Sequence, residues 1–540
     1  MFMNLIVFQD EITLYWDKEW ELDFAPDYCV YCNGEKVATT QKTYCSLRDL
    51  TANTKYELRV VASDPTGERE LYTGTVYTLA EKRRLDVTKA PYFAKGDGVT
   101  LNTSALQRAL DDCTKDDMVY FPAGVYLTGA LDVHDDTQIY IDENAVLQGS
   151  ACVNDYTPKI KSRFEGKEMM CYRSLLNLGV LDNKGGYNCK NVAIRGKGKI
   201  FGGGIDLTNA TITHETELLK DYLAQNSDYV KTCDNPKTIP ARARGRLINM
   251  SNCENIVLSG LHLGYAACWN IHFIYSKDIV TYDCFIQSNT VYDTDGNIVR
   301  AGVWNGDGWD PDSSENCVLF NSVFDTYDDG VAIKSGKNPE GNIINRPTKQ
   351  VRIFDCRGSH GVAIGSELSG GVDGVYIWDC HFSSTNGGRN FRIKTTRKRG
   401  GYVRNVKIKD SSFGDIRIWS GYTCNDDGES ANTLTDLENF DFHGVHVTGA
   451  IHHQKSDDTL WRFDPIIFVG FPELPIRNIR LKNVTIGKFE TNYQKQSGIY
   501  EYRFQTTYPQ PLNLPVDDYA QRVHLKYVKN LSIENLSQED

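Results

Sequence analysis

The sequence carries VRIFD at residues 351–355, VYIWD at 375–379 and VKIKD at 406–410, three copies of one short pattern. Each copy alternates apolar and variable positions and ends on a residue that favours a turn, which indicates a short strand. Further copies begin at Val192, Ile256, Phe440, Ile479 and Leu531. Most are about 23 to 40 residues apart, the spacing of solenoid coils. We therefore predict an all-β fold, a right-handed parallel β-helix in which each coil stacks its strands on those of the next.

The cysteines fit a packed solenoid better than a metal site or a disulfide framework. Cys284, Cys356 and Cys380 each follow the turn residue of a strand, so we expect them to form an internal ladder of small apolar side chains. The chain has 15 cysteines, mostly scattered singly, and the close pair Cys29 and Cys32 has no second pair at zinc-ribbon distance. These spacings predict no zinc site, and the scattered cysteines indicate free thiols in a reducing compartment; we also predict no cofactor.

A different pattern precedes the solenoid. Residues 1–80 show short alternating runs such as ITLYW at 12–16 and YELRVVA at 56–62, separated by turn pairs, which predicts a small β-sandwich. The stretch from Leu50 to Val60 resembles the fibronectin type III domain, a likeness that implies a corner contact for Tyr56. We interpret residues 81–90 as a linker and 91–540 as the solenoid domain.

The start of that second domain carries one helical signal. Asn102-Thr103-Ser104 is an N-cap cluster, and residues 105–110 have helical apolar spacing. Repeat stacks need a polar-faced cap at their ends, so we expect this helix to cover the first coil.

Composition excludes several classes of function. The 540 residues include 59 basic and 71 acidic side chains, a net charge of −12, which disfavours a nucleic-acid partner. No stretch approaches the roughly 20 apolar residues of a membrane helix. The N-terminal stretch lacks a basic region before its apolar run, so we expect no signal peptide and a cytoplasmic protein.

Four short motifs in the second half of the chain carry the chemistry. In order, they are Asn305-Gly306-Asp307, Asp328-Asp329, Ser359-His360-Gly361 and Arg392-Ile393-Lys394. Hydrolysis of a glycosidic bond needs one protonated carboxyl on the leaving oxygen and one carboxylate that activates water or attacks carbon. Adjacent acids favour a retained proton on one of them, and the two cations suit an anionic substrate group.

The coil period should bring these motifs together. Equivalent positions in successive coils of a β-helix become neighbours at roughly 4.8 Å. The motifs are about one coil apart along the chain, so we expect them to form a column on one face. Arg392 and Lys394 alternate on a strand and should point to the same side.

The same motifs, with Gly308-Trp309-Asp310 after the first, resemble the signature segments of glycoside hydrolase family 28, the polygalacturonases. The resemblance runs from about residue 87 to the C-terminus and implies a pectin-lyase-like solenoid and an inverting, metal-free hydrolase. It implies that Asp328 is the general acid, that Asp307 and Asp329 activate water, and that His360 tunes the acid. Arg392 and Lys394 would bind a substrate carboxylate. Gly306, Gly330 and Ser359 depart from the usual family residues.

Further residues are candidates for substrate binding. They are Asn305, Trp309, Lys334, Glu367, Trp269 and His272. For Trp269 and His272, a sugar platform competes with core packing. Arg397-Lys398-Arg399 is interpreted as a solvated turn. The long segment 337–349, with 309–314 and 365–367, resembles the exo-acting branch of the family, in which loops close one end of the groove.

The leading hypothesis is an exo-acting polygalacturonase that cuts de-esterified pectin or oligogalacturonides from the non-reducing end, with no nucleic-acid or membrane partner. Within the family, a rhamnogalacturonan or xylogalacturonan hydrolase is the alternative. Outside it, a calcium-dependent pectate lyase and a non-catalytic carbohydrate-binding β-helix stay open.

Overall fold

The computed structural model describes residues 3–65, 67–233, 235–382, 390–422, 428–448, 451–452, 461–462, 465–487 and 523–539. The chain divides into two compact units. One comprises Met1–Arg84 with Thr114–Met118, and the other comprises Leu85–Cys113 and Val119–Asp540. Among the described residues, none of the helices is long and apolar enough to cross a membrane.

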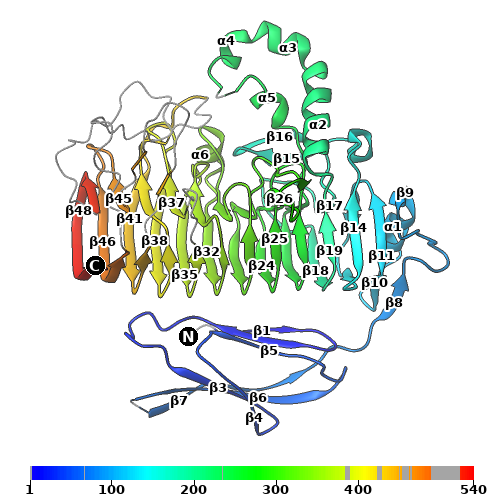
Figure 1. The fold of residues 1–540 in the computed structure, drawn as a ribbon, viewed down its shortest axis with the longest axis horizontal. Helices are drawn as coiled ribbons and strands as arrows, with labels where there is room; N and C mark the ends of the chain where they lie inside the picture. Colours follow the sequence, from blue (N-terminus) through cyan, green and yellow to red (C-terminus); the bar gives the residue numbers. More distant parts are fainter. Residues whose placement is uncertain are drawn as a thin grey trace. The chain divides into compact units, whose positions relative to one another are not determined.

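The first unit contains two antiparallel sheets, in the orders β1-β2-β5 and β4-β3-β6-β7 (Figure 1). Their strands are β1 (Met3–Val7), β2 (Ile12–Trp16), β3 (Asp27–Cys32), β4 (Glu35–Thr40), β5 (Tyr44–Leu47), β6 (Lys55–Asp64) and β7 (Gly67–Tyr77). Alternate residues of β2, β3 and β6 fill a shared apolar core that includes Trp16, Val30 and Val60. The predicted corner contact is present, because the Thr51 N–H donates to the Tyr56 hydroxyl at 2.9 Å.

The second unit is the predicted right-handed parallel β-helix. Two rows of strands make up most of a 24-stranded sheet. The first row is β10 (Asp117–Phe121), β13 (Gln138–Ile141), β18 (Cys189–Gly196), β21 (Cys253–Ser259), β24 (Lys277–Tyr282), β29 (Glu315–Phe320), β32 (Thr348–Phe354), β35 (Val372–Trp378), β38 (Tyr402–Lys409) and β41 (Asp436–His443). The second row is β11 (Gly124–Thr128), β14 (Ala145–Gly149), β19 (Lys199–Phe201), β22 (His262–Gly264), β25 (Phe285–Gln287), β30 (Val323–Asp325), β33 (Arg357–Gly358), β36 (His381–Phe382), β39 (Ser412–Phe413) and β42 (His446–Val447). The long strands β46 (Ile476–Ile486) and β48 (Val528–Gln538) pair with each other at the C-terminal end of this sheet.

An 11-stranded parallel sheet, here called the third sheet, forms the remaining face. Its strands are β12 (Leu131–Val133), β17 (Leu176–Leu178), β20 (Ile248–Ser251), β23 (Ile271–Ile274), β28 (Trp309–Asp312), β31 (Val331–Ile333), β34 (Val362–Gly365), β37 (Phe391–Lys394), β40 (Ile416–Trp419), β45 (Ile466–Val469) and β47 (Val523–Lys526). The side chains that point inward from the two rows and from the third sheet belong to one continuous apolar core.

The recurring sequence pattern sets the register of the coils. Val351 pairs with Val375, which pairs with Val406, and Phe440, Ile479 and Leu531 continue the same line. The residue before each apolar start often has a positive φ, as at Asn405 (φ 58°) and Asn439 (φ 62°). Asparagine tolerates this conformation, and here its side chain also bridges coils: the Asn439 amide donates to Asn405 at 3.1 Å.

The predicted cysteine ladder is confirmed as core packing. Cys284, Cys356 and Cys380 are buried, and all cysteines in the described part of the chain have free thiols. Ser322 lies in the same column, where its hydroxyl accepts the Cys284 N–H at 3.2 Å.

The first coil is covered as expected. Helix α1 (Thr103–Asp111) buries Leu106, Ala109 and Leu110 against the core at the end of the stack, next to β9 (Asp97–Leu101) (Figure 1). The predicted linker is partly regular, because β8 (Arg83–Asp86) pairs with β10.

Several insertions leave the coils. They are η1 (Val153–Tyr156), β15 (Ile160–Phe164) with β16 (Lys167–Cys171), α2 (Gly204–Leu218), α3 (Lys220–Gln225), α4 (Ser227–Val230), α5 (Thr238–Ala241), β26 (Val291–Tyr292) with β27 (Ile298–Arg300), α6 (Glu340–Ile344), and β43 (Ile451–His452) with β44 (Trp461–Arg462). The antiparallel β15–β16 hairpin matters most for the site. Its two-residue turn, Glu165 and Gly166, has φ values of 44° and 75°, as a tight primed turn requires.

Candidate active site

The third sheet brings the predicted motifs into one column. Trp309, Val331, Val362 and Phe391 are register partners on successive strands β28, β31, β34 and β37. Asp307, Asp329 and His360 each lie two residues before the first residue of their strand. The turns are bonded directly, since the Gly308 N–H donates to the Asp329 carbonyl at 3.0 Å. We call Asp307, Asp329 and His360 the site column.

The cationic pair completes this face. Phe391 and Ile393 point into the core, whereas Arg392 and Lys394 point outward from β37. The Lys394 ammonium donates to the Asp329 carboxylate. The Arg392 guanidinium lies 3.9 Å from the Asp415 carboxylate and keeps 15% of its side chain exposed.

Asp328 and His360 are only partly buried, so both can reach a ligand. The Asp328 carboxylate accepts a hydrogen bond from the backbone N–H of Asp329 at 3.0 Å. The backbone carbonyl of Asp328 accepts one from the Thr326 hydroxyl at 2.7 Å. His360 Nδ1 donates to the Thr326 carbonyl at 2.6 Å. That bond fixes the proton of a neutral ring on Nδ1 and leaves Nε2 as the acceptor.

Lys334 lies at the centre of a buried carboxylate cluster. Its ammonium is 3.4 Å from Asp307, 3.6 Å from Glu367 and 3.9 Å from Asp310. Burial alone would lower the pKa of Lys334, but the surrounding carboxylates raise it, so the side chain stays charged. Burial raises the pKa of Asp307, and the Lys334 charge opposes that rise.

Asp310 belongs to the same cluster, although it is not among the residues predicted for the site. It is fully buried, and among the described residues neither carboxylate oxygen has a hydrogen-bond partner. Burial raises the pKa of Asp310 well above its usual range. Burial therefore favours the protonated form of Asp310, while the nearby Lys334 charge opposes that effect.

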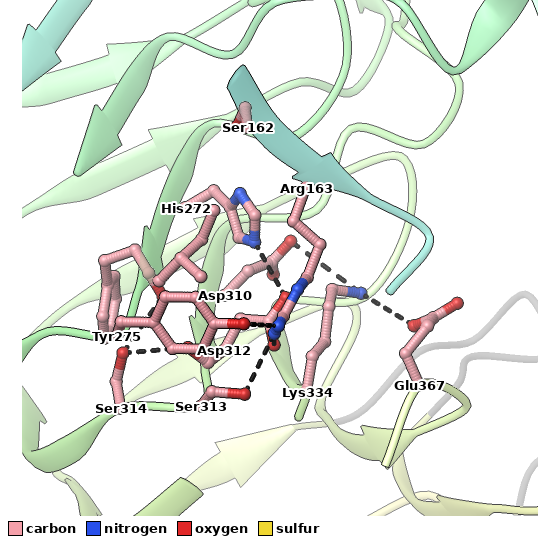
Figure 2. Close-up of polar contacts among 12 residues, drawn as sticks. Ser162, Arg163, His272, Tyr275, Asp310, Asp312, Ser313, Ser314, Lys334 and Glu367 are labelled. Carbon is pink, nitrogen blue, oxygen red and sulfur yellow. Dashed lines mark hydrogen bonds and ion pairs between the residues drawn. The ribbon is translucent and has the colours of Figure 1, made fainter. Parts of the chain in front are cut away.

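Strand β15 of the hairpin lies over the outward face of the third sheet, with Arg163 pointing toward Asp312 (Figure 2). Arg163 is 1% exposed and donates to Asp312 on β28 at 2.7 Å and to the Ser313 hydroxyl at 2.9 Å. Ser162 donates to Asn249 on β20 at 3.0 Å. Burial alone would raise the pKa of Asp312, but Arg163 and His272 lower it to about 2.

The turn of this hairpin also contacts the opposite wall. The Lys337 N–H donates to the Gly166 carbonyl at 2.9 Å. A Cβ on Gly166 would lie 2.6 Å from Lys337 and 2.9 Å from the Glu367 side chain. Glycine is therefore required where the hairpin meets the segment that follows β31.

Two predicted substrate contacts are wrong. Trp309 points into the core, fully buried, and its indole N–H donates to the Thr281 hydroxyl at 3.1 Å. His272 is fully buried under the hairpin, where its Nε2 lies 3.3 Å from Asp312. Burial lowers the pKa of His272 to about 4, so the ring is neutral at pH 7.

Other candidates lie beside the site in supporting positions. Trp269 stacks on Phe164 of the hairpin at 4.7 Å and carries Lys334 over its ring at 4.6 Å, so packing describes it better than a sugar platform. The Asn305 side-chain oxygen accepts the Arg244 guanidinium at 2.8 Å. The interpretation of Arg399 as part of a solvated turn is wrong, since it is buried and donates to Asn338.

Comparisons with known proteins agree with this architecture. The model of glycosyl hydrolases family 28 matches residues 186–456, which include the site column and the cationic pair. The chain belongs to glycosyl hydrolases family 28. This family 28 glycoside hydrolase is 26% identical to the exo-poly-alpha-D-galacturonosidase of Dickeya chrysanthemi over 457 residues, which are 75% of this chain and 72% of that protein. It is 28% identical to a probable polygalacturonase of Vitis vinifera over 407 residues, or 72% of each chain.

Solved structures share the fold of this family 28 protein. The family 28 exopolygalacturonase of Yersinia enterocolitica aligns with a TM-score of 0.71 at 17% identity, over 99% of this chain and 98% of that one. An exopolygalacturonase of Thermotoga maritima aligns with a TM-score of 0.60 at 21% identity, over 85% and 92% of the two chains.

Proposed function

We propose that this family 28 enzyme is an exo-acting polygalacturonase. It hydrolyses the α-1,4-galacturonosyl linkages of de-esterified pectin fragments or oligogalacturonides from the non-reducing end, with inversion at the anomeric carbon. The likeness to the Dickeya chrysanthemi enzyme supports the substrate class. The exo mode is carried by one observation, the cover that the β15–β16 hairpin places over the third sheet.

That cover ends the substrate path next to Asp307. Ser162, Arg163 and Phe164 of the hairpin contact β20, β28 and Trp269 respectively, so protein occupies the outward face there. A polymer lying along the third sheet cannot continue past the site column in that direction. Only a chain terminus fits beside Asp307 and Lys334.

The exposure and charges of these residues support the assignment of a general acid, a base that activates water and a cation that binds substrate. Asp328 is partly exposed and can donate its proton to the leaving oxygen, whereas Asp307 and Asp329 lie deeper and can hold and deprotonate water. Lys334 and Lys394 hold the two deeper carboxylates in place. Arg392, the more exposed of the β37 cations, offers a planar donor set to a galacturonate carboxylate.

Product analysis tests this function. Polygalacturonate and oligogalacturonates of defined length are incubated with the enzyme, and products are separated over time. We expect galacturonate or one short oligomer from the first minutes and little loss of polymer viscosity. Random intermediate lengths would contradict the exo mode, and an unsaturated product absorbing in the ultraviolet would point to a lyase.

Asp328→Asn tests the assignment of the acid. Because general acid catalysis contributes typically 10²- to 10⁴-fold, we expect kcat to fall by about that factor while oligogalacturonate binding persists. Asp379→Asn, at a coil turn outside the site, is the control. Retained turnover in Asp328→Asn would remove this residue from the mechanism.

The cytoplasmic location stays a prediction, which fractionation of producing cells tests.

A further inference from the structure

Ser288 follows β25 and lies between the two turns that carry the proposed acid and base. It is fully buried, and its backbone is held on both sides. Its N–H donates to the Asp325 carbonyl at 3.0 Å, and its carbonyl accepts the Val303 N–H at 2.9 Å. Ser288 therefore has one defined position relative to the coil that precedes Asp328.

The Ser288 hydroxyl joins the two turns. It donates to the carbonyl of Gly306, the residue before Asp307. It also accepts the backbone N–H of Tyr327, the residue before Asp328, at 3.1 Å. One buried oxygen thus bonds to the backbone immediately before each of the two carboxylates, which belong to successive coils.

A side chain at Gly306 would clash with Ser288. A Cβ at Gly306 would lie 2.5 Å from the Ser288 hydroxyl oxygen, 2.7 Å from its Cβ and 2.4 Å from the Val303 carbonyl oxygen. Its φ is not in the left-handed region, so backbone conformation alone does not demand glycine there. The small residue in the Asn305-Gly306-Asp307 motif is explained by the space that Ser288 and the Val303 carbonyl occupy together.

We propose that Ser288 is a positioning residue that fixes the separation of Asp307 and Asp328, with Gly306 as its steric complement. The inference rests on the proposed function, which assigns base and acid to those two residues. An inverting enzyme must leave room for one water between substrate and base, so the relative placement of its two carboxyl groups controls the rate. Displacements of about 1 Å in such sites can cost on the order of 100-fold in rate.

The test compares Ser288→Ala with Ser322→Ala. Ser322 is a matched control because it is also buried, donates its hydroxyl to the Phe320 carbonyl at 2.9 Å and accepts a backbone N–H, but joins no catalytic turn. Each variant is assayed for kcat and KM on a galacturonate trimer and for Tm. We expect both variants to lose similar stability. We expect kcat to fall about tenfold or more in Ser288→Ala alone, with KM within about twofold of wild type.

Equal kcat values in the two variants would overturn the inference while leaving the proposed function intact. If the wild-type enzyme releases no galacturonate product, the proposed function fails and this inference falls with it. Should Ser288→Ala not fold, Ser288→Cys keeps a side chain of similar shape with a weaker donor. We expect reduced kcat in that variant as well, and a wild-type kcat would refute the role of the hydroxyl.

Discussion

At the scale of single residues, the site depends on how buried charges are compensated. Lys334 neutralises part of the charge of Asp307 and Glu367, and burial raises the pKa of Asp310 beside them. Arg163 and Asp312 form a second buried pair under the hairpin, which His272 joins as a neutral ring. Removing one partner of a buried pair costs more than the pair contributes, so these residues are coupled to folding as well as to chemistry.

His272 should make the protein sensitive to acid. Its pKa is about 4 in the folded state and 6.5 in its reference state, so below pH 6.5 the unfolded chain binds a proton that the folded chain does not. The free energy of unfolding should therefore fall as the pH drops from about 6.5 to about 4, by about 3 kcal/mol. Asp312 adds a further loss only below about pH 4, because its folded pKa is about 2. Urea unfolding across this range checks the slope, and His272→Gln should flatten it between pH 6.5 and 4; an unchanged slope would contradict the assignment.

At the scale of elements, the asparagine-lined turn holds successive coils in register. Asn439 donates to Asn405 at 3.1 Å and accepts from Asn478 at 2.9 Å, with φ at 62°. Two properties of asparagine are combined here, tolerance of a left-handed backbone and an amide that both donates and accepts. Substitutions that keep one property and remove the other separate their contributions.

Asn439→Ala should destabilise the protein more than Asn439→Gly. Glycine loses the amide ladder but accepts the positive φ, whereas alanine loses the ladder and adds about 1 kcal/mol of backbone strain. Chemical denaturation of both variants measures the difference. If the two variants are equally stable, backbone strain at this turn is not what asparagine relieves.

The β15–β16 hairpin is the element expected to set product length. Arg163→Met breaks the pair with Asp312 and should destabilise the protein by about 3 to 5 kcal/mol while loosening the hairpin over the third sheet. We then expect longer oligomers to appear among the products of polygalacturonate at a temperature where the variant is folded. Lys161→Met is the control, since Lys161 lies on the same strand but pairs with Glu168 with half of its side chain exposed. Identical product profiles in both variants would show that the hairpin does not close the groove.

At the scale of the whole molecule, the sequence predicts the repeating coils of the β-helix but not the hairpin that is inserted between them. The apolar period and turn residues predicted the coil register, and hence the approach of Asp307, Asp329 and His360. Strand alternation also indicates the burial of Trp309, because it is the register partner of the inward Val331. The role of Arg163 could not be read in this way, since it depends on a hairpin that begins about 150 residues before the site and carries only a tight-turn signal at Glu165-Gly166.

Because the hairpin covers the third sheet on one side only, we expect the substrate chain to bind in one direction. The hairpin contacts β20 and β28, and its turn reaches the segment after β31, so on the proposed function we expect substrate to approach the site column from the β37 side. With the non-reducing end held beside Asp307, each turnover removes sugar from that end only. A galacturonate pentamer labelled at its reducing end should therefore give labelled products that shorten stepwise, while the first products released carry no label. Chromatography with fluorescence detection follows both series, and a small labelled fragment in the first turnovers would mean that the chain binds in the opposite direction.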